Sequence, residues 1–274
     1  MLGKLLKHEF IATGRIMGAV YAVVGLIIAY VLGSYYIGHE GATAGQTIGI
    51  AVLMLISMCN FVLTTVVMVV NFQKSLYGEQ GYLSFTLPVK SISLFSSKVI
   101  VSTVWYVAAF LCLVGTAAVT GIVLKEDLIG EEGYSMIESF LPMFLNGKTI
   151  ATLITTVIIW LVSMFIRFTM FTVELYFAIS LANTRKFQKR YTLWTIVFIV
   201  LTVGVAEKIA SFLSSKLTFG LEILNSSIRF ITDATALESG ASFINLTELI
   251  VSLIIGGVFF YLTHYVMSKK VNIR

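Results

Sequence analysis

The sequence predicts an all-α polytopic membrane protein, with six transmembrane helices in a single transmembrane domain over residues 1–274. Three observations predict this fold class. The chain is 58% hydrophobic and 12% charged, about half the charge of a soluble domain. The charges are missing from six blocks, each long enough to cross the roughly 30 Å apolar core of a bilayer as a helix. The blocks do not alternate apolar and polar residues, as the strands of a membrane β-barrel do.

The chain begins with a stretch of mixed character, residues 1–15. Apolar residues recur near helical spacing, with basic ones between them: Leu2, Leu5, Leu6, Phe10 and Ile11, then Lys4, Lys7 and His8. This pattern predicts an amphipathic helix on the cytoplasmic leaflet, with its apolar face toward the lipid. A plain extension of the first span is the alternative.

The six spans are predicted at about residues 16–37, 47–71, 99–124, 149–182, 192–212 and 247–267. The third is the least ambiguous, and the fifth is interrupted by Glu207 and Lys208. Cys59 and Cys112 fall within spans and are expected to be buried free thiols without a disulfide. The three histidines are scattered along the sequence, so no metal site is predicted.

The basic residues predict the orientation. Of the 19 Lys and Arg residues, 13 lie at the N-terminus, after span two, after span four and in the tail. Five lie on the opposite side: Lys125, Lys148, Lys208, Lys216 and Arg229. The positive-inside rule therefore places both termini in the cytoplasm. The net charge of +5 follows from this asymmetry and does not indicate a nucleic-acid partner.

Two ionisable residues lie inside span four. Arg167 and Glu174 are seven positions apart and share a helix face. The basic cluster from Arg185 fixes the inner end of the span, which places Arg167 near the outer interface and Glu174 near the midplane. A carboxylate there is costly and often functional. Both are candidate pathway residues. The alternative for Glu174 is a structural acid, protonated or hydrogen-bonded between helices.

The segments on the outer side are short. Residues 125–148 are acidic, and residues 208–246 contain amphipathic pieces such as KIASFLSSKLTFGLEIL. The second segment is predicted to form interfacial or partly re-entrant helices. Neither is large enough for a separate extracellular domain.

The cytoplasmic segment 72–98 is unusually apolar. It contains GEQGYLSFTLPV, with Tyr82, Leu83 and Phe85 close together before Pro88. A contiguous apolar patch marks an interaction site, and proline stiffens the chain, so a short docking element is predicted. The alternative is that these side chains only dip into the lipid headgroups.

Motifs of enzyme chemistry are missing from the sequence. The Gly147-Lys148-Thr149 triplet has Pro142 where a phosphate-binding loop needs its first glycine. The chain is therefore expected not to be an enzyme, and any energy for work is expected to come from another chain.

The segment after span two carries the most specific pattern in the chain. It reads Glu79, Gln80, Gly81, Tyr82, Leu83, Thr86, Leu87, Pro88 and Val89, followed by Ser97-Lys98. This pattern, together with the basic start, six spans and lysine-rich tail, resembles the membrane subunits of ABC type-2 transporters, which are bacterial exporter permeases. Gln80 departs from the family, which commonly has Glu there.

The resemblance implies an ATP-driven exporter that moves a peptide, drug or lipid-like substrate across the bacterial cell membrane. The coupling segment would contact a separate ATPase subunit through Glu79, Gln80, Gly81, Tyr82, Leu83, Phe85, Thr86, Leu87 and Pro88. ATP and Mg would be bound by that partner, and no cofactor by this chain. A second permease copy or a paralogue would complete the membrane core. Two other functions stay open: an ion- or proton-coupled carrier or channel using Glu174, and a non-transporting scaffold or sensor subunit.

Overall fold

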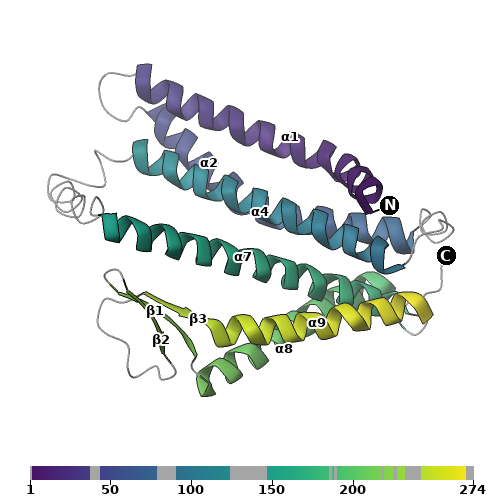
Figure 1. Ribbon diagram of the computed structural model, residues 1–274. Helices are drawn as coiled ribbons and strands as arrows, with labels where there is room; N and C mark the ends of the chain where they lie inside the picture. The colour runs from purple at the N-terminus through teal and green to yellow at the C-terminus, as the bar shows by residue number, and fades with distance from the viewer. Residues whose placement is uncertain are drawn as a thin grey trace. The chain divides into compact units, whose positions relative to one another are not determined.

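The computed structural model describes residues 2–37, 44–78, 91–123, 147–184, 187, 190–217, 219–224, 227–231 and 242–269, and they are almost entirely helical (Figure 1). The six long helices are α1 (Leu2–Ile37), α2 (Ala44–Tyr77), α4 (Ser91–Val123), α7 (Gly147–Ala182), α8 (Tyr191–Lys216) and α9 (Leu246–Lys269). Each is long and apolar enough to cross a membrane. The prediction of six apolar helices in a multi-pass membrane protein is confirmed at this level.

The chain divides into two compact units. One comprises Met1–Asn71 and Ile100–Glu138, and the other comprises Phe72–Val99 and Ser139–Arg274. The division passes through α2 and α4, so the end of α2 and the start of α4 belong to the second unit. The prediction of one transmembrane domain stays a prediction.

In the first unit, α1 buries one face along its length. Its most buried residues are spaced by four and seven positions: Thr13, Met17, Val24 and Val31. This spacing keeps them on one side of a helix. Val31 packs against Ile50 and Leu53 of α2. The core of this unit is therefore a narrow apolar seam between long helices.

The start of α1 is held by polar contacts to other helices of the same unit. Asn71 Nδ2 donates a hydrogen bond of 3.1 Å to Glu9 Oε2, and Trp105 Nε1 donates one of 2.9 Å to Thr13 Oγ1. The helix runs unbroken from Leu2 to Ile37. The separate amphipathic surface helix predicted for residues 1–15 is not confirmed, because these contacts make that stretch the first part of one long helix.

In the second unit, α7, α8 and α9 pack against one another. Small residues allow the close approach. Ala206 and Ala210 are buried on α8, and a Cβ at Gly256 of α9 would overlap the Sδ of Met170 on α7. Helices in membranes commonly pack through such small residues. Glu207 and Lys208 interrupt only the apolar run of the fifth span, since α8 continues through both of them to Lys216.

A small antiparallel sheet connects α8 to α9. It consists of β1 (Gly220–Leu224), β2 (Ser227–Ile231) and β3 (Ser242–Asn245) in the order β2-β1-β3. The sheet lies beside the end of α8 and the start of α9 (Figure 1). The helices predicted across 208–246 are therefore wrong for residues 220–224, 227–231 and 242–245, which form strands. Gly220 pairs with Ile231 and with Asn245, and these partners are too distant in sequence for helical periodicity to indicate them.

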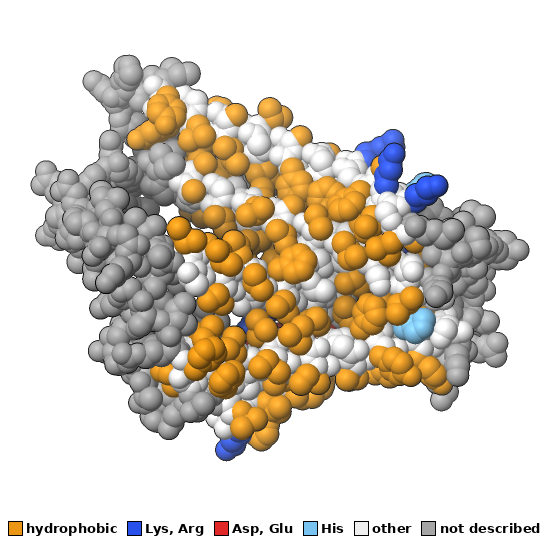
Figure 2. Space-filling view, in the orientation of Figure 1, with side chains coloured by type: hydrophobic (Ala, Val, Ile, Leu, Met, Phe, Trp, Pro, Cys, Tyr) orange, Lys and Arg blue, Asp and Glu red, His pale blue; other side chains and the backbone are white. Residues whose placement is uncertain are grey.

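Hydrophobic side chains cover the sides of the helices on the face seen in Figure 2, while Lys and Arg side chains lie at helix ends, near the start of α1 and the end of α8. Large apolar residues such as Leu26, Met58 and Val200 are exposed, as expected for side chains that face lipid. Cys59 is also exposed, and both it and Cys112 are free thiols. The expectation that Cys59 is buried is wrong, because its position on α2 faces outward.

Candidate functional site

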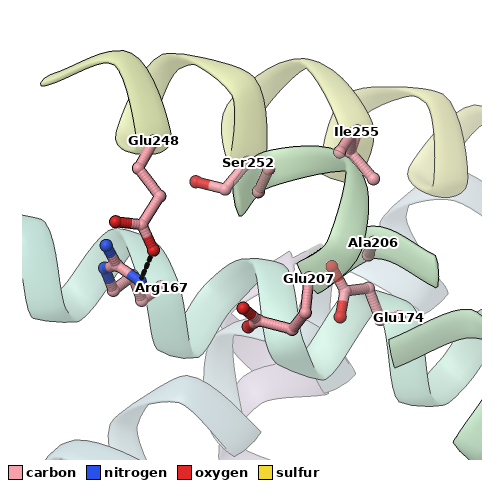
Figure 3. Close-up of a pocket in the computed structure, with 8 residues that line it drawn as sticks. Arg167, Glu174, Ala206, Glu207, Glu248, Ser252 and Ile255 are labelled. Carbon is pink, nitrogen blue, oxygen red and sulfur yellow. Dashed lines mark hydrogen bonds and ion pairs between the residues drawn. The ribbon is translucent and has the colours of Figure 1, made fainter. Parts of the chain in front are cut away.

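Arg167 and Glu174, the two ionisable residues predicted on one face of span four, line a common cavity in the second unit. The cavity lies between α7, α8 and α9 (Figure 3). Its lining is Arg167 and Glu174 from α7, Ala206, Glu207 and Ala210 from α8, and Glu248, Ser252 and Ile255 from α9. The structure therefore brings the two predicted residues to one site and adds two carboxylates to them.

Arg167 is ion-paired. Its Nη1 donates a hydrogen bond of 2.8 Å to Glu248 Oε1, with 45% of the arginine side chain and 29% of the glutamate side chain exposed. Glu248 lies in the first turn of α9, where the helix dipole stabilises a negative charge. The sequence predicted only that Arg167 reaches toward the outer interface. The structure gives it a partner at the start of the neighbouring helix.

The start of α9 is fixed by the chain that leads into the sheet. Thr247 Oγ1 accepts a hydrogen bond of 2.9 Å from the Phe219 amide and donates one of 3.2 Å to the Phe219 carbonyl. The amides of Leu246 and Thr247 also donate to that carbonyl. These bonds satisfy free N–H groups at the helix end and hold Glu248 opposite Arg167.

Glu174 is in a different position. Its side chain is 8% exposed, and no hydrogen bond or ion pair reaches it from the part of the chain that the structure describes. The carboxylate of Glu207 lines the same cavity and repels it. Burying a lone carboxylate in the apolar part of a membrane is expensive. No described side chain neutralises the charge of Glu174, so another species must neutralise it.

Glu207 lies on α8 beside the two buried alanines. Because Ala206 and Ala210 are small, α8 can approach α7 and α9 closely, and Glu207 then reaches the cavity from the edge of that contact. Its own side chain is exposed. Arg167 attracts Glu207 as well as Glu248. The guanidinium is bonded to Glu248, and no bond joins it to Glu174 among the described residues.

The volume and charge of the cavity limit what it can hold. Three carboxylates and one guanidinium line it, and the space between them has a volume of about 30 Å³. This is room for one or two water molecules and far below the roughly 300 Å³ of a pocket for a drug-sized ligand. The space suits a small polar species such as water.

Metal binding is not supported by the described side chains. Within the described ranges, no three His, Cys, Asp or Glu residues are arranged to hold a metal ion. The three carboxylates of the cavity come from separate helices and one of them is taken by Arg167.

The predicted ATPase-contact residues lie outside the described residues, which resume at Ser91 after Gly78. They are Glu79, Gln80, Gly81, Tyr82, Leu83, Phe85, Thr86, Leu87 and Pro88. Of the same pattern, Ser97 and Lys98 are described, and both are buried in α4. The acidic segment 125–148 also lies outside the described residues, apart from its last two residues.

The residues that flank the predicted contact segment form an aromatic cluster with α7. The rings of Phe72 and Tyr176 stack with centroids 3.8 Å apart, and Phe95 contacts both edge-on. Tyr77 donates a buried hydrogen bond of 2.7 Å to Ser180 Oγ. We call Phe72, Tyr77, Phe95, Tyr176 and Ser180 the flank cluster. It fixes both ends of the segment to one helix.

Sequence reasoning did not identify Glu207, Glu248 and Ser252 as site residues. The signal for Glu207 was present, because a carboxylate inside an apolar run is itself a functional indication, but the residue was noted only as an interruption of the apolar run. Glu248 was indistinguishable from an ordinary charge at a helix start. Only the packing of α9 on α7 brings it to Arg167.

The sequence was compared with protein-family models and with curated proteins, and the structure was compared with solved structures; no match was found in any of the three comparisons.

Proposed function

We propose that the chain is the membrane subunit of an ATP-driven exporter of the ABC type-2 class, working with separate ATPase subunits that bind ATP and Mg. A second copy or a paralogue would complete the membrane core in the bacterial cell membrane, with both termini in the cytoplasm. Support comes from the six apolar helices and from the resemblance in the pattern from Glu79 to Val89. The cargo would be a peptide, drug or lipid-like molecule.

One structural observation favours this function over the others. A segment that passes motion from an ATPase to a membrane domain has to be firmly attached to the helices it moves. Both flanks of the segment that follows Gly78 are attached in this way, through the stacked rings of Phe72 and Tyr176 and the bond from Tyr77 to Ser180. Buried aromatic packing with satisfied hydroxyl groups gives such an attachment rigidity.

The test is the double variant Tyr82→Ala with Phe85→Ala. Aromatic anchors at an interface typically contribute on the order of 2 kcal/mol or more, which is at least about 25-fold in affinity. We expect the variant to lose its ATPase subunit during purification in detergent while remaining folded. Co-purification of the ATPase and transport-linked ATP turnover are the measurements.

A matched control is Tyr261→Ala. Tyr261 lies on α9 with 67% of its surface exposed. Its substitution therefore removes an aromatic ring without changing the predicted contact segment. This control should keep the ATPase bound. If the double variant behaves like the control in both measurements, the segment is not the coupling element.

A proton- or ion-coupled carrier is the second candidate, and the burial of Glu174 in the cavity favours it. It predicts that the purified chain transports its cargo after reconstitution without any ATPase, and that Glu174→Gln changes the rate. The exporter predicts flux only when the ATPase and ATP are present. A scaffold or sensor subunit predicts partner binding without flux in either case.

A further inference from the structure

We propose that the cavity between α7, α8 and α9 is a proton-binding site, in which Glu174 takes up the proton and the neighbouring Glu207 sets how tightly it is held. The inference concerns a proton bound by this chain alone. It does not depend on the proposed exporter, because no ATPase is needed for it.

The first step is the isolation of Glu174. Its side chain is more than nine-tenths buried and lines the cavity, where Figure 3 shows its carboxyl group. No described residue donates a hydrogen bond to it or pairs with it. An ionised carboxylate without any partner is strongly disfavoured in an apolar span. A proton removes that charge.

The second step is the set of charges that face Glu174. From α7 the facing charge is Arg167, from α8 it is Glu207, and from α9 it is Glu248. Arg167 is bonded to Glu248 at 2.8 Å and also attracts Glu207. Arg167 therefore compensates Glu248, the charge of Glu207 remains, and Glu174 has no counter-charge among the described residues that line the cavity. Lys208 follows Glu207 in the sequence but is exposed and is not among the described residues that line the cavity.

The third step is the identity of the ligand. Among the described residues, no three His, Cys, Asp or Glu side chains form a metal-binding group, and the space of about 30 Å³ has the size of one or two water molecules. A water molecule fits this volume and can deliver a proton. In the uptake step, a hydronium ion gives its proton to a carboxylate oxygen of Glu174. One O–H bond breaks, one forms, and a neutral water molecule is left.

The test is modification of the purified full-length chain with dicyclohexylcarbodiimide, a lipid-soluble reagent that adds to protonated carboxyl groups. Peptide mass spectrometry reads the extent of modification at each glutamate. We expect Glu174 to be modified several-fold more than Glu248, which is held as an ion pair. Modification of Glu174 should fall as the pH is raised from about 5 to about 9, because the reagent adds to the protonated acid and ionisation removes that form.

Glu207→Gln tests the second half of the proposal. Removing a neighbouring negative charge makes ionisation of Glu174 easier. The midpoint at which modification is lost should therefore move to lower pH, by about one unit for a close like charge. Glu248→Gln is the matched control, because it changes one carboxylate of the same cavity that is paired with Arg167. Its effect on the midpoint should be smaller.

Infrared spectroscopy provides an independent measurement that does not need the reagent to reach the cavity. The difference spectrum between low and high pH should contain the C=O stretching band of a carboxylic acid, and Glu174→Gln should remove it. The proposal is overturned if folded protein gives no such band from Glu174. It is equally overturned if modification of Glu174 is independent of pH or if Glu207→Gln leaves the midpoint where it was.

Discussion

Gly256 controls how closely α7 and α9 approach in the second unit. A Cβ at this position would overlap Met170 Sδ, whereas a Cβ at the next residue, Gly257, would have no atom within 4 Å. The two glycines are adjacent on one helix and have opposite surroundings, since Gly256 is buried and Gly257 is exposed. They therefore form a matched pair for testing the contact.

We predict that Gly256→Ala destabilises the protein by about 1–3 kcal/mol, the usual result of adding atoms to a packed contact. Gly257→Ala should be neutral or slightly stabilising, because alanine is the better helix former. Thermal unfolding in detergent is the measurement. Adding Met170→Ala to Gly256→Ala should restore part of the loss. Equal stability of the two single alanine variants would mean that the methionine simply moves aside.

The flank cluster is the clearest packing feature at the level of whole elements. It joins the end of α2 and the start of α4 to α7, with the rings of Phe72, Phe95 and Tyr176 in mutual contact. The hydroxyl of Tyr77 donates to Ser180, whose own hydroxyl donates to the Tyr176 carbonyl at 2.7 Å. The hydroxyl groups of Tyr77 and Ser180 each donate a hydrogen bond within a buried contact, which makes the geometry specific.

Tyr77→Phe should lower the free energy of unfolding by about 1 kcal/mol, because it removes one buried hydrogen bond and keeps the ring. For a chain of this size that corresponds to a fall in melting temperature of about 2–4 °C. Tyr261→Phe makes the same chemical change at an exposed position of α9 and should leave the melting temperature unchanged. A fall of similar size in both variants would show that the Tyr77 hydroxyl has no special role.

At the level of the whole molecule, the distribution of Lys and Arg predicts the orientation in the membrane. Cysteines introduced at Gln188 and at Glu131, both outside the described residues, report on opposite sides. In intact cells an impermeant thiol reagent should modify the cysteine at Glu131 and spare the one at Gln188, because the basic loop is predicted to be cytoplasmic.

This labelling needs a background without native thiols, since Cys59 is exposed and Cys112 is partly exposed. Permeabilised cells provide the control, because both introduced cysteines should then react. The opposite pattern in intact cells would reverse the orientation and place both termini outside.

The sequence by itself determined the six membrane helices and the approximate limits of most of them. A span is recognised from the length and apolar character of one continuous run, which is a local property. The shared face of Arg167 and Glu174 followed equally from helical spacing. The predicted limits of α9 differ from the observed ones by one residue at the start and two at the end, because charges and turn residues bound that run closely.

Only the tertiary structure decided which groups meet. The pairing of Arg167 with Glu248 joins residues 81 positions apart, and the approach of Glu207 to Glu174 depends on two alanines that let α8 close on α7. The sheet of residues 220–245 and the docking of Glu9 and Thr13 at the start of α1 were missed for the same reason. Strand pairs and interhelical hydrogen bonds are fixed by partners distant in the chain, and the pattern of a single segment contains no information about those partners.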